Sequence, residues 1–447
     1  MKRLTFLLAA TVVSAALWAQ TPSQAIVDTT LSTEPKQEFS TGIDILARGE
    51  FRQGGLMPVD ENGEAIYGDD RATFFLERSR LWVKYARPWL QAYINVQHSG
   101  VWGQSGRGSF NLYEAWARVQ SKQGIFAQVG RIGLSYDDER IIGSDDWTVA
   151  ASSHDVVRVG YEGHNHKVHA IFAFNQNAEN VSGGTYYVNG AQPYKAMHDL
   201  WYHFDAPRLH LGVSALFMNI GMQHGDKMNY DTKYQQLMGT YLCYAPPSWK
   251  VEASGYYQCG RTEYDIPLSA WMMSVRASHV FNPRWKAFVS YDLLSGDENF
   301  HVPPIGGLGF AQLKKIHGFN PLYGSHHKFY GAMDFFYLST YYGGLTPGLH
   351  NLQAGGTWTP IPRLSVNAAY HYMATMVKVP DCSYSLGHMM ELGASWSIMK
   401  DVKLSVGYTF MRGTSTMERL KRTTADRQLH WGWISFRVNP RIFSIKW

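Results

Sequence analysis

The chain has 447 residues, of which 14% are aromatic and only 17% are charged, and it contains 42 glycines and 27 tyrosines. Its mean hydropathy of −0.26 excludes a protein built from apolar membrane helices. Abundant tyrosine and tryptophan instead fit the aromatic girdles at the two interfaces of a transmembrane β-barrel. The formal net charge is only +5, so an electropositive feature must come from the arrangement of side chains, and no nucleic-acid partner is expected.

Residues 1–19 have the pattern of a secretory signal peptide. Lys2 and Arg3 form a positive start, an apolar core runs from Leu4 to Leu17, and Ala19 precedes the expected cleavage site. The apolar run is shorter than the ~20 residues that a membrane-spanning helix needs. We therefore expect a secreted chain.

The rest of the chain repeats one pattern: a polar loop of variable length, a strand, a tight turn and another strand. Proline marks most of the turns, because it presets a turn and cannot donate to a sheet ladder. The turns fall at residues 87–88, 122–124, 163–165, 206–208, 246–248, 282–284, 360–362 and 399–401. Eight hairpins with one further strand at each end give eighteen strands. We therefore expect a periplasmic tail over 20–38 and, over 39–447, an all-β transmembrane outer-membrane β-barrel of about eighteen antiparallel strands.

The expected strands alternate with period two between an apolar and a polar face. In 76–86, Leu81 and Val83 oppose Arg80 and Lys84. The apolar set must face lipid, because Arg or Lys at the bilayer midplane costs roughly 2–4 kcal/mol. The same rule puts these side chains of 89–98, 111–120 and 402–411 on the lipid face: Leu90, Ala92, Ile94 and Val96; Tyr113, Ala115, Ala117 and Val119; Leu404, Val406, Tyr408 and Phe410.

A soluble β-sandwich would show the same alternation. It is excluded by the signal peptide, by long loops that alternate with short turns, and by the terminal aromatic residue Trp447. The segment 439–441 interrupts the last strand with a proline, and Arg437 fits neither face of that strand cleanly. Residues 295–348 form one long loop, which is uncommon unless functional. We expect this loop to fold over or into the lumen and to narrow it.

Residues 124–163 hold two alternating strands around a loop crowded with charge. Gly130-Arg131, Tyr136, the run 138–143, Trp147 and Asp155-x-x-Arg158 resemble the signature of the alginate export porin family. The resemblance implies an outer-membrane barrel of eighteen strands that passes an anionic polysaccharide.

Cations at lumen positions are the predicted site residues. Arginine presents a planar fork that matches carboxylates, and rings of Arg and Lys are a common selectivity device for anions. An alternative is that these cations pair with lumen acids such as Glu77, Glu114, Glu162, Asp199 and Glu252 and brace the barrel. The predicted pore-lining set is Arg78, Arg80, Lys84, Arg118, Arg158 and Arg276, with Arg131 and Arg140 at the mouth.

Other chemistry is weakly indicated. The acids Asp137, Asp138, Glu139, Asp145 and Asp146 suit a hard cation by type, but they lack EF-hand spacing, and arginine pairing is the better interpretation. Lumen aromatics either stack on sugar rings or fill volume; they are Trp82, Tyr93, Trp116 and Tyr256. The common catalytic motifs are absent, so we predict no enzyme, no cofactor and no metal site.

Two functions stay open. The first is a passive channel for an anionic oligo- or polysaccharide, such as an alginate-like uronate polymer. The alternative is a general or differently selective porin for small solutes on the same scaffold. In both, the protein is a monomeric barrel among the lipids of the outer membrane of a Gram-negative bacterium.

Overall fold

The computed structural model describes residues 37–54, 71–104, 108–175, 193–226, 228–297, 314–333, 346–421 and 428–447. The expected signal peptide (1–19) and all but the last two residues of the expected tail (20–38) lie outside these ranges. The first half of the sheet contains β1 (Glu38–Gln53), β2 (Arg71–Arg87), β3 (Leu90–Val101), β4 (Ser109–Gln120), β5 (Ile125–Ile132), β6 (His154–Gly163), β7 (His166–Phe174), β8 (Ala196–Ala206) and β9 (Leu211–Gly225). The second half contains β10 (Tyr230–Tyr244), β11 (Trp249–Arg261), β12 (Pro267–Asn282), β13 (Trp285–Leu294), β14 (Leu349–Ile361), β15 (Leu364–Ala374), β16 (Ser385–Met399), β17 (Val402–Gly413), β18 (Gln428–Val438) and β19 (Arg441–Lys446).

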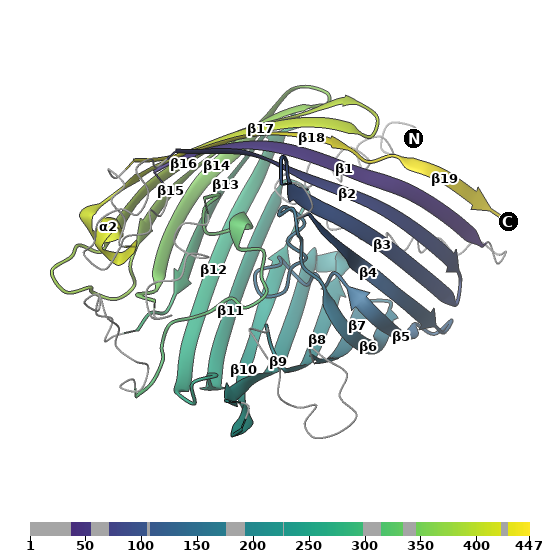
Figure 1. Ribbon diagram of the computed structural model, residues 1–447, viewed down its shortest axis with the longest axis horizontal. Helices are drawn as coiled ribbons and strands as arrows, with labels where there is room; N and C mark the ends of the chain where they lie inside the picture. Colours follow the sequence, from purple (N-terminus) through teal and green to yellow (C-terminus); the bar gives the residue numbers. More distant parts are fainter. Residues whose placement is uncertain are drawn as a thin grey trace.

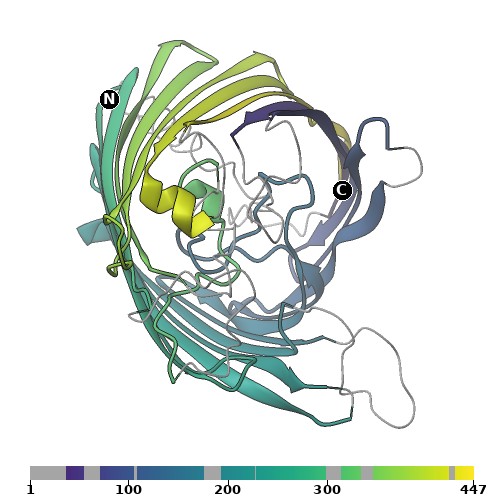
Figure 2. The same cartoon turned by 60° about the vertical axis from the view of Figure 1, so that its left-hand side comes forward.

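These strands form one antiparallel sheet that closes into a barrel (Figures 1 and 2). Each strand pairs with the next along the chain, and β1 closes the ring by pairing with β2 on one edge and with β18 and β19 on the other. The short β19 follows β18 along β1 after a break at Asn439 and Pro440, because proline cannot donate to the ladder. The predicted barrel of eighteen antiparallel strands is confirmed.

All eight predicted tight turns join consecutive strands where the sequence places them. They lie at one end of the barrel, and the long connections lie at the other. We call these the short-turn end and the long-loop end. In the described part of the chain, helical structure is limited to α2 (Ser415–Lys421) and two single 3₁₀ turns, Pro207–Leu209 and His326–Lys328. Among the described residues, no helix is long and apolar enough to cross a membrane.

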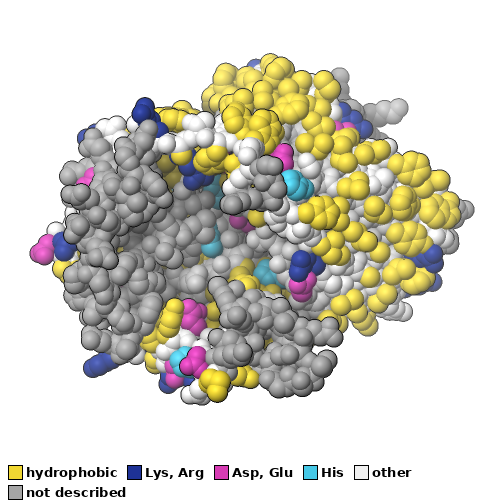
Figure 3. Space-filling model, in the orientation of Figure 1, with side chains coloured by type: hydrophobic (Ala, Val, Ile, Leu, Met, Phe, Trp, Pro, Cys, Tyr) yellow, Lys and Arg dark blue, Asp and Glu magenta, His cyan; other side chains and the backbone are white. Residues whose placement is uncertain are grey.

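The outer face of the barrel is apolar, as the alternation predicts. Exposed side chains on it include Leu81, Ile94, Val129, Val406 and Ile434. Hydrophobic side chains gather over this outer face in Figure 3. Exposed tryptophans mark its short-turn end: Trp89, Trp249, Trp285, Trp358 and Trp396.

The prediction for β4 is wrong at one position. Tyr113 was expected on the lipid face, yet it is buried inside the barrel. The register against β3 shifts here, so that Asn95 opposes Glu114 while Val96 opposes Leu112. The extra residue on β4 turns Tyr113 inward, and Leu112 takes the outward place.

The long-loop half of the lumen is apolar rather than polar. Inward-facing methionines from β8, β9, β12, β15, β16 and β17 are fully buried there: Met197, Met218, Met272, Met373, Met389 and Met411. Two connections pack on them, which we call the first inserted segment (residues 133–153) and the second inserted segment (residues 314–333). Both lie within the ring of strands in Figure 2. The second is the described middle of the expected long loop 295–348; residues 298–313 and 334–345 of that loop lie outside the described ranges.

The seam between β1 and β18 can be tested with a disulfide. Ala47 and Phe436 are direct partners across it. In a variant whose three native cysteines are replaced by serine, Ala47→Cys with Phe436→Cys should cross-link on oxidation, because direct partners have Cα atoms about 4.5–5.5 Å apart. Non-reducing electrophoresis of the unfolded protein measures the cross-link. Ala47→Cys with Ile434→Cys, two residues out of register, should cross-link far less; equal yields from both pairs would contradict this closure.

Candidate pore-lining site

The two inserted segments are hydrogen-bonded to each other and to the wall. The Gly143 amide donates to the Tyr323 carbonyl at 2.9 Å, and the Tyr323 amide donates to the Ile141 carbonyl at 3.1 Å. The second segment is held by Gln258 on β11, which donates to the Asn320 carbonyl and accepts from the Asn320 amide. The described parts of the two segments are therefore joined to each other and to the wall.

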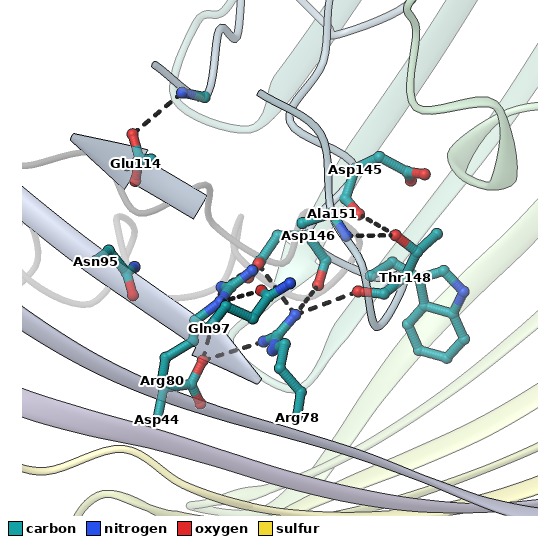
Figure 4. A network of polar contacts seen from close by, with 12 residues as sticks. Asp44, Arg78, Arg80, Asn95, Gln97, Glu114, Asp145, Asp146, Thr148 and Ala151 are labelled. Carbon is teal, nitrogen blue, oxygen red and sulfur yellow. Dashed lines mark hydrogen bonds and ion pairs between the residues drawn. The ribbon is translucent and has the colours of Figure 1, made fainter. Parts of the chain in front are cut away.

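A buried ion cluster ties the first inserted segment to β1 and β2 (Figure 4). Arg78 is fully buried and contacts the Asp44 carboxylate at 3.0 Å and the Asp146 carboxylate at 3.1 Å. Arg80 also binds Asp146 and donates to Gln97 at 2.7 Å. Arg437 on β18 completes the cluster through Asp44 at 2.7 Å.

This cluster gives Arg78 and Arg80 a bracing role. Three guanidinium groups share two carboxylates, and Arg78 also donates to the main-chain carbonyls of Asp146 and Thr148. Removing one partner of a buried pair leaves an uncompensated charge, which costs about 3–5 kcal/mol. Arg437, whose face the sequence left undecided, points inward with Arg78 and Arg80.

Arg140 was expected at the mouth of the pore, but it is buried inside the barrel. Its guanidinium group contacts Asp138 at 3.0 Å and Asp292 on β13 at 2.9 Å, and it stacks on Phe329 of the second inserted segment at 3.9 Å. Burial alone would lower the pKa of Arg140, but Asp292 and Asp138 raise it well above its ordinary value. Arg140 therefore joins both inserted segments to the wall at β13, away from the first cluster on β1 and β2.

Arg118 and Arg158 face inward, as the alternation predicts, and both are engaged by neighbours. Arg118 contacts Glu162 at 2.8 Å and stacks on Phe126 at 3.8 Å. Arg158 donates to Gln128 and to the Tyr136 hydroxyl of the first inserted segment. Their geometry matches the bracing alternative for both residues.

Arg131 does not lie at the pore mouth. It shares the outward face of β5 with Ile125 and Val129, and it forms a two-point ion pair with Asp155 on the outside of the barrel. The pair is partly exposed, with 38% of the Arg131 side chain accessible. Its parity with the apolar residues of β5 was visible in the sequence and should have excluded a lumen role.

A cavity of about 1130 Å³ opens between the inserted segments and the wall formed by β17, β18, β1 and β2. Of the predicted site residues, Arg80 and Lys84 line it, and the other six do not. Five further cations on the strands around it were not in the predicted set: Arg48, Lys403, Arg437, Arg441 and Lys446. Lys328 of the second inserted segment lines the cavity as well. The lumen position of Lys403 was detectable in the sequence, because Lys403 alternates with the apolar residues of its strand.

The cations of this wall differ in their partners. Arg437 pairs with Asp44, and Arg441 and Lys446 share Glu38 at 3.4 and 3.7 Å. Within the described ranges, no ion pair joins Lys84 or Lys403 to a carboxylate. Lys403 instead lies directly opposite Arg437 across the β17–β18 ladder. The short-turn half of the cavity therefore carries excess positive charge.

Three predicted lumen aromatics line the same cavity. Trp82, Tyr93 and Trp116 follow one another across β2, β3 and β4, with ring centroids 6.4 and 5.7 Å apart. Tyr256 is buried in the apolar core instead. Gly42 makes room for the Trp82 ring, because a Cβ there would lie 2.5 Å from it. The cavity thus has an aromatic strip beside its cationic wall.

The last predicted cation, Arg276, faces a separate cavity of about 120 Å³ between β11, β12 and β13. It stacks on Phe288 at 3.8 Å, and Lys250 and Lys286 line the same space. Across the described part of the chain, no group of three or more His, Cys, Asp or Glu side chains is placed to hold a metal ion.

Comparison with known proteins gives matches in structure only. No protein-family model matches the chain, and no curated protein matches it in sequence. The fold is similar to that of Pseudomonas aeruginosa OccK9 (OpdG), with a TM-score of 0.60 and 10% identity over 90% of this chain and 98% of that one. A BenF-like porin from Pseudomonas fluorescens Pf-5 gives 0.59 at 9% identity over 90% and 99%. P. aeruginosa OccK2 (OpdF), solved in complex with glucuronate, gives 0.58 at 10% over 90% and 98%.

These similarities correct the family prediction. The solved structures named above are Occ proteins and a BenF-like porin, and the expected membership of the alginate export porin family is wrong. The signature residues Arg140 and Trp147 lie in the first inserted segment, where they hold that segment in place. Such a structural role explains their presence without a polysaccharide. Identities this low establish the fold alone.

The bracing role of Arg78 can be tested by Arg78→Gln. The substitution leaves Asp44 and Asp146 buried with less positive charge, so the first inserted segment should detach from the wall. We expect a higher single-channel conductance in planar bilayers and a lower apparent unfolding temperature. Arg131→Gln is the control, because an exposed pair contributes only about 0–1 kcal/mol. A wild-type conductance in Arg78→Gln would show that the cluster does not hold the segment.

Proposed function

We propose that the protein is an outer-membrane porin that passes small anionic solutes by passive diffusion. The observation that carries the proposal is the pair of lysines, Lys84 and Lys403, that face the cavity with no carboxylate bound to them in the described structure. A cation directly opposite another cation, as Lys403 is opposite Arg437, destabilises a sheet unless something compensates. A passing anion supplies that compensation.

Several features support a small solute rather than a polymer. The inserted segments fill much of the lumen, and the cavity of about 1130 Å³ is close to the ~300–1,000 Å³ of typical small-molecule sites. The OccK2 structure was solved with glucuronate, a single anionic sugar. We therefore propose a solute of that size with at least one carboxylate, and not a polysaccharide.

The wall suits weak, repeated contacts with such a solute. Lys84, Lys403 and Arg437 lie on strands that neighbour one another around β1 and β18, so an anion moves between cations without leaving the positive field. Conduction requires binding that is favourable enough for entry and weak enough for exit. Asp44 and Glu38 on the same wall moderate the attraction. We place the barrel in the outer membrane with its short turns toward the periplasm and its long connections toward the outside of the cell, as is usual for outer-membrane barrels.

The proposal predicts anion selectivity in a salt gradient. The reversal potential of the wild type in planar bilayers should have the sign of anion preference. Two opposite unit charges ~4 Å apart in water attract each other by about 1 kcal/mol, and salt reduces this attraction. The combined variant Lys84→Gln with Lys403→Gln should therefore lower the anion-to-cation permeability ratio by roughly two- to fivefold.

The matched control removes two lysines at the same end of the barrel but outside the lumen. Lys122→Gln with Lys400→Gln changes exposed residues of two short turns, so its selectivity should equal that of the wild type. A cation-selective wild type, or equal changes in both double variants, would contradict the proposal.

A further inference from the structure

A group of basic side chains lies on the outside of the barrel, at the long-loop ends of β16, β17 and β18. His388 shares the outward face of β16 with the exposed Met390 and Leu392. Arg412 and His430 are at the equivalent ends of β17 and β18. Cross-strand register places His388 directly opposite Arg412. On the other side Arg412 is opposite Gln428, and His430 is two residues further along β18. We call these three residues the external basic patch.

The patch lies at the edge of the membrane rather than in its core. On β16, His388 is followed eight residues later by the exposed Trp396 of the short-turn girdle. On β14, His350 and the exposed Trp358 have the same spacing. Eight residues at ~3.4 Å each span about 27 Å along a strand, and a strand tilted by ~40° then rises about 20 Å. This rise covers most of the ~25 Å apolar band of an outer-membrane barrel, so the histidines lie at the long-loop edge of that band.

Among the described residues, no acid on the outward surface of the neighbouring strands neutralises the patch. Over their described residues, the outward faces of β14 to β18 carry no Asp or Glu; the single acid of these strands, Glu391, is buried inside. Within the described structure, no hydrogen bond or ion pair to the Arg412 side chain is found; its backbone pairs in the ladders of β16 and β18. Basic residues at the same rim elsewhere do have partners, since His98 contacts Glu77 at 3.3 Å and Arg131 contacts Asp155 at 2.7 Å.

Two tyrosines orient the histidines of the patch. The Tyr408 hydroxyl bonds Nδ1 of His430 at 2.7 Å, and the Tyr370 hydroxyl bonds Nδ1 of His388. When the hydroxyl donates to Nδ1, the proton of the neutral ring is on Nε2. That nitrogen then becomes a donor to a group outside the barrel. Together with the guanidinium fork of Arg412, these nitrogens give the patch several hydrogen-bond donors. The patch itself contains no negatively charged group.

We propose that the external basic patch binds the phosphate of a phosphorylated lipid headgroup in the outer leaflet. Phosphate is the group that a guanidinium fork and neighbouring N–H donors match. It also supplies the negative partner that the Arg412 guanidinium does not have among the described residues. The apolar side chains below the patch, Met390 and Tyr408 among them, then contact the acyl chains of the same lipid. This inference rests on the membrane placement of the proposed function and is independent of the solute.

The test compares two lipids on the folded full chain in detergent. The probes are lipid A with both phosphates and the same lipid after enzymatic removal of the phosphates. Native mass spectrometry measures the occupancy of each. The wild type should bind the phosphorylated lipid about tenfold more tightly, since hydrogen bonds to charged groups are the strong ones. Equal binding of the two lipids by the wild type overturns the proposal without any variant.

The variant His388→Gln/Arg412→Gln/His430→Gln should lose most of this preference. Its matched control is His98→Gln/Arg131→Gln/His198→Gln, which makes the same three changes at the same rim outside the patch. Heat-modifiable electrophoretic mobility confirms that each variant is folded. The control should keep the wild-type preference; an equal loss in both variants would mean that total charge, not the patch, attracts the lipid. If the wild type conducts anions normally but shows no preference for the phosphorylated lipid, the lipid inference is refuted and the proposed porin function stands.

Discussion

The structure depends on the closure of β1 onto β18. Lipid hydrocarbon provides no hydrogen-bond partner, so every backbone N–H and C=O at membrane depth must be paired within the sheet. Both edges of β1 are paired, with β2 on one side and with β18 and β19 on the other. Even the break at Pro440 is bridged, since the Ile43 amide donates to the Pro440 carbonyl at 3.2 Å. Closure gives each strand a lipid face and a lumen face, and the side-chain pattern follows from that.

A closed ring of this size leaves an interior that side chains of the strands alone do not fill. In the long-loop half, the inserted segments pack against inward methionines, whose flexible thioether chains fill irregular gaps. Apolar packing is not directional, so two ion clusters fix the position of the segments. Asp146 is held by Arg78 and Arg80 on one wall, and Arg140 is held by Asp292 on another. The cavity remains between the segments and the β17–β18–β1–β2 wall, in the part of the lumen that the segments do not fill.

Local features of the fold were predictable from the sequence. The eight turns, the strand count and most strand faces follow from proline placement and period two, which depend only on neighbouring residues. Tyr113 was mispredicted because a bulge shifts the parity without a clear local signal. The bracing partner of Arg78 was not identified either, because Asp146 lies 68 residues away in an inserted segment. Alternation alone does not report which loop enters the lumen.

The same limit explains why inward parity alone was a poor guide to function. Parity tells where a cation points, whereas its role depends on whether the fold brings a carboxylate to it. Arg78 and Lys403 both point inward, yet Arg78 meets two carboxylates and Lys403 meets Arg437. On the outside, Arg131 meets Asp155, while the strands around Arg412 carry no outward acid in their described residues. A paired cation has little attraction left for a ligand, so the recognition proposed for the lumen and for the lipid surface depends on cations that meet no carboxylate in the described structure.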